Sequence, residues 1–129
     1  MIYNATKHEV QHLIPWQYCK ESTQHSIMKK LAKLGWHPSN PILNGLVVPK
    51  NLPNGMVFHH GSHPAYNEWV DDALTKMDNT MPESQLYGKM MKLTDFLNSK
   101  IEEAYQNGKS LNSYFKDDVK KFDIINLDY

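Results

Sequence analysis

The sequence of 129 residues contains no arginine, a single cysteine and no long apolar run. Without arginine, contact with a phosphate group falls to lysine, histidine, hydroxyl groups or backbone amides. The lone Cys19 excludes an internal disulfide. No apolar stretch approaches the roughly 18 residues of a transmembrane helix, and the first residues, MIYNATKHEV, lack the apolar part of a signal peptide. We therefore expect no association with a membrane, and export only by another route or as part of a longer chain.

Histidine and charge are unevenly distributed along a chain whose formal net charge is zero. Residues 1–63 contain six lysines, two acidic residues and all seven histidines, a net charge of +4; the other 66 residues contain eight lysines and twelve acidic residues, a net charge of −4. This asymmetry favours an anionic partner for the first half. Lysines and acids that only coat helices would give the same counts, and composition does not decide between the two interpretations.

Proline and glycine divide the first half into short elements. HEVQHLIPW at 8–16 has the features of an extended segment stopped by Pro15, whose ring disfavours helix at the preceding residue. Apolar spacing predicts a helix from about Ser22 to Leu34, with Gly35 placed to end it. Between 36 and 58, four prolines and two Asn-Gly pairs predict loops and short strands, with no helix and with a turn at Asn44-Gly45.

Three helices are predicted in the remaining chain. The first begins at Ser62, a good N-cap with proline in the first turn; the second runs from about Glu83 to Gln106 and stops at Asn107-Gly108; the third begins at about Ser110. Apolar residues recur in each at helical spacing, which predicts one buried face. The predicted core residues are Tyr66, Trp69, Val70, Ala73, Leu74 and Met77, then Leu86, Met90, Leu93, Leu97, Ile101 and Ala104, then Leu111, Tyr114, Phe115, Val119 and Phe122.

FHHGSHPAYNEWV at 58–70 places three histidines in five positions at the start of the first of these helices. Asn67 and Asp71 follow His63 at intervals of four residues, so the three side chains form a column on the helix. Two side chains of such a column can bind one metal ion, and neutral imidazole is a common ligand. A histidine at a helix start also serves as a cap or a surface residue, and spacing alone leaves both interpretations open.

His12 is a second candidate for chemistry. It lies near the end of the extended segment, directly before Leu-Ile-Pro. If the segment is a strand, His8 lies on the same face, because alternate residues of a strand point the same way. A buried histidine with satisfied hydrogen bonds would fit the same position, so the sequence alone does not distinguish a chemical role of His12 from a structural one.

Three blocks of this chain resemble, in the correct order, motifs of the AHH group of nucleases. QHLIPW at 11–16 resembles its His-His-Ile/Leu-Ile-Pro block, PILNGLVVP at 41–49 its Asn-Gly-hydrophobic-Leu/Val-Pro block, and HHGSHPAYNEWV at 59–70 its His-Gly-Ser-His-Pro-x-Tyr-Asn block. This group belongs to the HNH or His-Me finger (ββα-metal) superfamily and typically forms toxin domains of bacterial polymorphic toxins and effectors. The resemblance implies an α+β fold: one nuclease domain over 1–129, with a ββα-metal core at 8–77 and a helical extension at 83–129.

The resemblance also implies roles for single residues. His12 matches the family's second histidine, the general base that takes a proton from the attacking water, a task suited to an imidazole pKa of about 6.5. Asn44 matches the asparagine that braces the loop holding the base. His63 and Asn67 match metal ligands on the helix, and His60 is a candidate to bind metal or phosphate. Folding must then bring His12 to the start of the helix, with room for one cation and a water.

One divalent metal ion is the implied cofactor, with Mg²⁺ expected first and Zn²⁺, Ni²⁺ or Mn²⁺ as alternatives. It would stabilise charge on a non-bridging oxygen and on the departing 3′ oxygen. Lysines of the first half are candidates to hold the polyanion through salt-dependent contacts, although each also fits an ordinary surface residue. These candidates are Lys7, Lys29, Lys30, Lys33 and Lys50.

One position departs from the family pattern. The first histidine of the His-His pair is here Gln11. In the enzymes that the chain resembles, this position supplies a metal ligand, and an amide oxygen is a poorer donor than imidazole for a transition-type metal. Three explanations stay open: Gln11 binds a hard ion such as Mg²⁺ through its oxygen, another side chain such as His8 takes its place, or activity is weakened or altered.

The resemblance therefore predicts a metal-dependent endonuclease that hydrolyses DNA, with RNA as the other candidate substrate. It implies a toxin delivered by a specialised secretion system into the cytoplasm of a target bacterium, and a cognate immunity protein as partner. Two other functions stay open. One is a non-catalytic module that binds nucleic acid or metal on the same scaffold. The other is a structural helical domain with incidental histidines, although their confinement to the interrupted first half argues against it.

Overall fold

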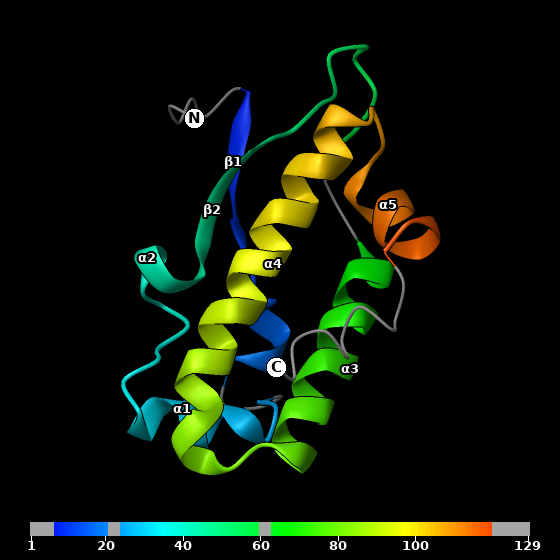
Figure 1. Ribbon diagram of the computed structural model, residues 1–129. Coiled ribbons are helices and arrows are strands. Elements are labelled where there is room, and N and C mark those ends of the chain that lie inside the picture. The colour runs from blue at the N-terminus through cyan, green and yellow to red at the C-terminus, as the bar shows by residue number, and fades with distance from the viewer. Residues whose placement is uncertain (1–6, 21–23, 60–62, 120–129) are drawn as a thin grey trace.

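The computed structural model describes residues 7–20, 24–59 and 63–119. Its fold is α+β: a small antiparallel sheet lies beside two long helices and several short ones (Figure 1). The elements in chain order are β1 (His8–His12), the 3-10 turn η1 (Trp16–Tyr18), α1 (Ile27–Lys33), α2 (Pro41–Asn44), β2 (Gly45–Pro49), α3 (Pro64–Thr80), the 3-10 turn η3 (Glu83–Gln85), α4 (Leu86–Gln106) and α5 (Leu111–Asp117).

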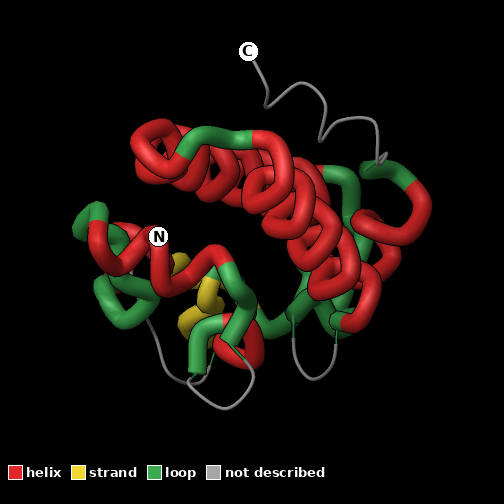
Figure 2. The backbone as a smooth tube through the Cα atoms, turned by 90° about the horizontal axis from the view of Figure 1, so that it is seen from below, coloured by secondary structure: helices red, strands yellow, loops and turns green. Residues whose placement is uncertain are grey.

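The sheet joins two segments that are distant in the chain. β1 pairs antiparallel with β2, so that His8 lies opposite Pro49 and His12 opposite Gly45. Both strands lie to one side of the layer of helices (Figure 2). Along β1, Gln11 is buried whereas Val10 and His12 are exposed, as expected of a strand with one face toward the core. The predicted extended segment is confirmed for its first five residues, but the chain turns into η1 at Trp16.

The predicted helix before Gly35 is shorter than expected. α1 begins at Ile27, not at Ser22. Its end is confirmed: Gly35 has a φ of 93°, its N–H donates to the carbonyl of Ala32, and the N–H of Trp36 donates to the carbonyl of Leu31. These two bonds form the Schellman arrangement, which needs a left-handed residue and therefore favours glycine.

The prediction of no helix between 36 and 58 is wrong at one place. Asn40 accepts a hydrogen bond from the N–H of Ile42 and starts the single turn α2, which ends at Asn44. The predicted Asn-Gly turn is also wrong, because Gly45 has an extended φ of −105° and begins β2. A side chain at Gly45 would place its Cβ 2.8 Å from the carbonyl oxygen of Pro41. The glycine is needed for this close approach of backbone, and not for a left-handed conformation.

α3 and α4 form the centre of the core. The observed N-cap of α3 is His63, while the predicted cap, Ser62, lies outside the described residues. α4 begins at Leu86 after η3, and it ends at Gln106 before Gly108 as predicted. The apolar stripes are confirmed, since every core residue predicted for these two helices is buried. None of the described helices is both long and apolar enough to cross a membrane.

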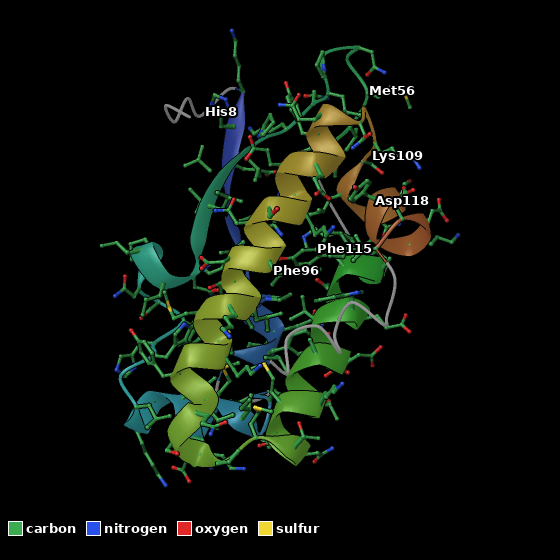
Figure 3. The ribbon with its side chains drawn as sticks, in the orientation of Figure 1. His8, Met56, Phe96, Lys109, Phe115 and Asp118 are labelled. Atoms are coloured by element: carbon green, nitrogen blue, oxygen red, sulfur yellow. The ribbon has the colours of Figure 1, made fainter. Side chains whose placement is uncertain are left out.

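α5 packs on the first turns of α3. The ring of Phe115 lies 4.7 Å from that of Tyr66 and 5.9 Å from that of Trp69, and Figure 3 labels it at this contact. The N–H of Leu111 donates to the carbonyl of Phe58. Leu111, Phe115 and Val119 are buried as predicted and Tyr114 is partly buried, whereas Phe122 lies outside the described residues.

We predict that Asp78→Asn weakens the contact between α1 and α3 in a pH-dependent way. Lys30 Nζ lies 2.8 Å from Asp78 Oδ1, and Ser26 also donates to this carboxylate, which holds the pKa of Asp78 below its usual value. A carboxyl group whose pKa is lower in the folded state stabilises the fold above its unfolded pKa, and this effect is lost as pH falls through the folded pKa. Urea unfolding should therefore show the variant less stable by about 0.5–1 kcal/mol at pH 7, and the difference should shrink and then disappear as the pH falls below the usual pKa of an aspartate and through the lowered pKa of Asp78.

The control is Asp95→Asn, because Asp95 is exposed on α4. Its effect on the free energy of unfolding should be smaller and should change little with pH. Equal pH dependence for the two variants would contradict the contribution assigned to the Lys30–Asp78 pair.

Candidate active site

The inner face of β1 meets the start of α3. Glu9 Oε1 lies 2.5 Å from His59 Nδ1, and the ring of His59 lies 5.1 Å from that of His63. The ring of His63 in turn packs edge-on against Tyr66 at 5.3 Å. The Tyr66 hydroxyl donates to the carbonyl of Leu13 at 2.6 Å, and Leu13 is the residue directly after β1. These contacts bring the sheet and the histidine-rich helix start together.

His63 and Asn67 lie side by side, as the spacing predicts. Pro64 disfavours helical backbone at His63, so this residue stands at the N-cap with a φ of −134°. Its Nδ1 lies 3.0 Å from Asn67 Oδ1. The predicted third member of the column is directed elsewhere, because Asp71 Oδ1 lies 3.6 Å from Nε2 of His25. His60 lies outside the described residues.

The environment of His63 favours its neutral form. Burial lowers the pKa of His63, and the nearby His59 lowers it further, against smaller opposing effects that include the contact with Asn67. A neutral imidazole can bind a metal ion without first losing a proton. The position is therefore suited to a ligand.

Gln11 is the residue of β1 that points into this region. Its side chain is 3% exposed, and neither amide atom makes a hydrogen bond within the described part of the chain. It lies near the Tyr66 hydroxyl, where it opposes the rise in the Tyr66 pKa that burial causes. His59 Nε2 is likewise buried without a partner among these residues. Buried polar atoms without partners each cost about 1–3 kcal/mol and call for an explanation.

A divalent metal ion fits these donors. His63 Nδ1 and Asn67 Oδ1 are joined by a hydrogen bond at 3.0 Å, and two ligands of one octahedral ion stand about as far apart, so the pair could bind an ion in place of that hydrogen bond. Gln11 lies at the hydroxyl of Tyr66 and His63 against its ring, so the amide oxygen of Gln11 is a further candidate donor in this region. The described residues include no group of three or more His, Cys, Asp or Glu side chains that could hold an ion. The donor set is therefore mixed imidazole and amide oxygen, which suits a hard ion better than a set of imidazoles does.

Asn44 holds the chain that follows β1. Its side chain is fully buried; Oδ1 accepts from the N–H of Ile14 at 2.7 Å, and Nδ2 donates to the carbonyls of Ile14 and Pro38, both at 3.2 Å. The carbonyl of Asn44 also accepts from the N–H of Leu13. One side chain thus fixes both backbone polar groups of a residue two positions after His12, as the match to a bracing asparagine implies.

His12 points away from the buried donors. It is exposed, and its ring lies 5.8 Å from that of Trp16. Strand alternation places it on the face of β1 opposite to Gln11. The strand reaches the start of α3, as predicted, but the side chain that points inward is Gln11. His12 as the general base stays a prediction.

His8 is not placed to substitute for Gln11. It lies on the same face of β1 as His12, at the outer end of the strand (Figure 3). The residue that shares the inner face with Gln11 is Glu9, which is bound to His59. Of the three explanations for the loss of the first histidine, the one in which His8 takes its place therefore does not fit the structure.

A comparison with protein families matches residues 2–91 to the AHH family, described as a nuclease family of the HNH/ENDO VII superfamily with conserved AHH. The chain belongs to the AHH nuclease family. No curated protein and no solved structure matches it. Nucleases of this superfamily generally use divalent metal ions, whereas the described residues of this chain show no metal site. The matched region of this AHH nuclease contains Gln11, His12, Asn44, His63 and Asn67.

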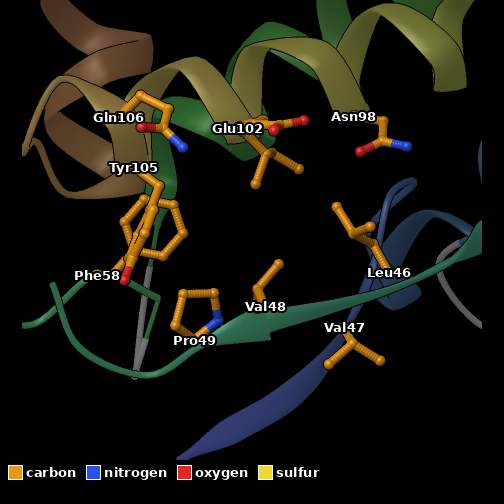
Figure 4. A pocket seen from close by; sticks show the side chains of 10 residues that line it. Leu46, Val47, Val48, Pro49, Phe58, Asn98, Glu102, Tyr105 and Gln106 are labelled. Carbon is orange, nitrogen blue, oxygen red and sulfur yellow. The ribbon is translucent and has the colours of Figure 1, made fainter. Parts of the chain in front are cut away.

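A hollow of about 490 Å³ lies beside His59 and His63 of the AHH nuclease, and the other candidate site residues that the structure describes do not line it. The segment Gly55–His59, His63, Ser110 and Asn112 line it, so His59 and His63 are reached from this side. A second cavity, of about 260 Å³, lies between β2 and α4 (Figure 4). Leu46 and Val48 point into it from β2, opposite Asn98 and Glu102 of α4, and none of the candidate catalytic or metal-binding residues lines it.

The lysines predicted to bind nucleic acid do not form one group. Lys7 and Lys50 are joined by a backbone hydrogen bond beside the start of β1, whereas α1, with Lys29, Lys30 and Lys33, lies at the other end of the molecule (Figure 1). Lys30 is paired with Asp78. A role in binding phosphate stays a prediction for these lysines.

Sequence reasoning missed three residues that build the site. Glu9 could have been found, because it precedes Gln11 by two positions and a strand puts both on one face. Tyr66 was assigned to the core, and its hydroxyl bond to Leu13 gave no signal. Asn112 Oδ1 accepts from the N–H of Ala65 at 2.8 Å and so caps the first turn of α3 from α5. No pattern in the sequence indicates that contact, since the two residues are far apart in the chain.

We predict that Asn44→Ala destabilises the AHH nuclease by about 2–4 kcal/mol, because it leaves the buried N–H of Ile14 without a partner and its carbonyl with only the weak Cys19 thiol as donor. Urea unfolding followed by circular dichroism measures the loss. The matched control is Asn40→Ala, which removes the exposed cap of the same helical turn. It should cost about 1 kcal/mol, and a loss for Asn44→Ala no larger than this would contradict the bracing role.

Proposed function

We propose that this protein is a metal-dependent endonuclease that hydrolyses phosphodiester bonds of DNA. The observation that supports the proposal is the His63–Asn67 pair at the start of α3, packed on Tyr66, whose hydroxyl lies beside the buried amide of Gln11, all within the region matched to a nuclease family. RNA is the alternative substrate. The sheet and α3 then form a ββα-metal core over 8–77, and residues 83–129 form a helical extension that supports it.

In this proposal His12 is the general base. Because it lies on the face of β1 opposite to Gln11, the phosphodiester has to reach it at the exposed end of the strand. The exposure of His12 leaves the imidazole open to a water and to a phosphodiester arriving from solvent, while Asn44 keeps the chain after it from shifting. The imidazole takes the proton of the water as its oxygen attacks phosphorus. A side chain in this role contributes typically 10²–10⁴-fold to a rate.

His63, Asn67 and Gln11 hold the divalent ion, with Mg²⁺ expected first and Mn²⁺, Zn²⁺ or Ni²⁺ as alternatives. When bound, it supplies Lewis-acid stabilisation of the charge that develops on the phosphate and on the departing 3′ oxygen. His59, oriented by Glu9, presents its free Nε2 at the same place. His60, a candidate for metal or phosphate, retains that assignment as part of the proposal.

The biological setting follows from the family resemblance. We infer a toxin domain of a bacterial polymorphic toxin or secreted effector, delivered into the cytoplasm of a competing cell. A producing cell must protect its own DNA, so a cognate immunity protein is the partner that this setting requires.

A second candidate function rests on Gln11. Replacement of the usual histidine favours a module that binds nucleic acid or metal without cleaving. Incubation of the purified protein with plasmid in Mg²⁺, Mn²⁺, Ni²⁺ or Zn²⁺, and in EDTA, separates the two functions. Nicking that EDTA abolishes supports the endonuclease, and binding without nicking in every ion supports the module.

We predict that His12→Ala lowers the rate of plasmid cleavage by about 100-fold or more, because the water loses its general base. The matched control is His8→Ala, on the same face of the same strand, which should keep cleavage within about threefold of the original rate. Initial rates of supercoiled plasmid loss at saturating metal measure both. Full cleavage by His12→Ala would end the assignment of the base.

We predict that Gln11→His raises the affinity for Zn²⁺ or Ni²⁺ by about tenfold or more relative to Mg²⁺, because imidazole is the better donor for these ions. Calorimetric titration of EDTA-stripped protein measures it without reference to cleavage. Asn67→Ala should weaken binding in the same experiment. Unchanged Zn²⁺ and Ni²⁺ affinity in Gln11→His would remove Gln11 from the ligand set.

A further inference from the structure

Trp16 is the one tryptophan of the chain that faces solvent. Its side chain is 50% exposed, whereas Trp36 and Trp69 are 0% and 2% exposed. An exposed apolar side chain of this size adds little to the stability of the core, so its placement calls for a separate explanation.

The ring is mounted on a fixed turn. The N–H of Tyr18 donates to the carbonyl of Pro15, and the N–H groups of Cys19 and Lys20 donate to that of Trp16, at 2.9, 2.9 and 3.0 Å. The buried Cys19 thiol also donates to the carbonyl of Pro15, and burial raises its pKa to about 12, so it stays protonated. The Tyr18 hydroxyl donates to the carbonyl of Asn67 and anchors the turn to α3. Because the turn is already fixed, its backbone would lose little conformational freedom when Trp16 binds a partner.

The surroundings of Trp16 match a strand of nucleic acid. Its ring lies 5.8 Å from that of His12, with 39° between the two planes. Val10, on the same face of β1 as His12, is 53% exposed, and Lys20, one turn after Trp16, is exposed as well. Proteins that bind single strands combine an aromatic face, which stacks on a base, with cationic side chains, which attract the phosphate, and Trp16 with the exposed Lys20 of the same turn offers both groups.

We propose that Trp16 stacks on an unpaired base of the substrate, and that the enzyme therefore prefers single-stranded segments at the site of cleavage. The inference rests on the proposed function in one respect: His12 is taken as the base that acts beside this stack. In a duplex both faces of each base are covered by its neighbours, and flipping a base out costs a few kcal/mol. An unpaired base offers its face to Trp16 at no such cost.

The test uses the intrinsic fluorescence of the complete chain. Since Trp36 and Trp69 are buried, quenching by an added oligonucleotide reports on Trp16. Metal-free protein in EDTA is titrated with three probes: an oligothymidylate, an abasic strand of the same length and charge, and a duplex. The expected result is saturable quenching by the oligothymidylate, with weaker binding and little quenching by the other two. An oligouridylate tests whether an unpaired RNA base serves equally.

Two variants separate stacking from electrostatic attraction. Trp16→Leu should lower the affinity for the oligothymidylate, followed by anisotropy of a labelled strand, by about tenfold or more, whereas Trp16→Phe should recover most of it. Ile42→Ala, which alters an exposed apolar residue of α2, is the matched control and should bind as the original chain does. Unfolding curves show whether Trp16→Leu keeps its stability, and Trp16→Phe remains informative if it does not.

Each result decides one of the two proposals. Quenching by the oligothymidylate without cleavage in any ion would support the stacking site and reject the nuclease proposal. Equal affinity of the original chain and Trp16→Leu for the unpaired strand would overturn the stacking site, whatever the cleavage assay shows. Equal binding of the abasic and base-containing strands would also overturn it, and would leave Trp16 for contact with a protein partner.

Discussion

Alternation along β1 is the constraint on which the site depends. Adjacent residues of a strand point to opposite faces, so Gln11 turns toward Tyr66 while His12 turns toward solvent. A slip of one residue in the pairing with β2 would exchange them and bury the imidazole. The register is fixed at the C-terminal end of β1, where His12 lies opposite Gly45 and Asn44 is hydrogen-bonded to Leu13 and Ile14. Gly45 is part of the same constraint, since any side chain there would collide with Pro41.

The helical extension has a structural connection to the site that its sequence does not reveal. The family match ends at residue 91, yet Asn112 caps the first turn of α3 and Phe115 packs on Tyr66 and Trp69. His63 and Asn67 stand on that same turn. The extension therefore restrains the residues that bear the ligands, and an extension with another sequence could do so through other contacts.

Local regularities were predictable from the sequence, and contacts between distant segments were not. The stripes of α3 and α4 follow from a period of 3.6 residues, and the ends at Gly35 and Gly108 from the conformational freedom of glycine. The His63–Asn67 pair was predictable because both residues belong to one turn of helix. The direction of His12, the isolation of the Gln11 amide and the pairing of Asp71 with His25 depend on how segments far apart in the chain meet. α2 was missed because four prolines in 36–58 argued against any helix, although proline is favoured at the first position of one.

The amides of Gln11 and Asn67 give the site a chemical character of its own. Both are neutral and donate less charge than carboxylates or thiolates, so in the proposed site a bound ion would keep more of its positive charge for the phosphate. They also bind more weakly, which makes affinity depend on how well the donors are arranged beforehand. The burial of Gln11 would meet that need in the proposed site, because its amide oxygen makes no hydrogen bond within the described part of the chain. If Gln11 binds the ion as proposed, filling the site would offset the free energy spent in burying the amide, and folding stability and metal affinity would be coupled through one side chain.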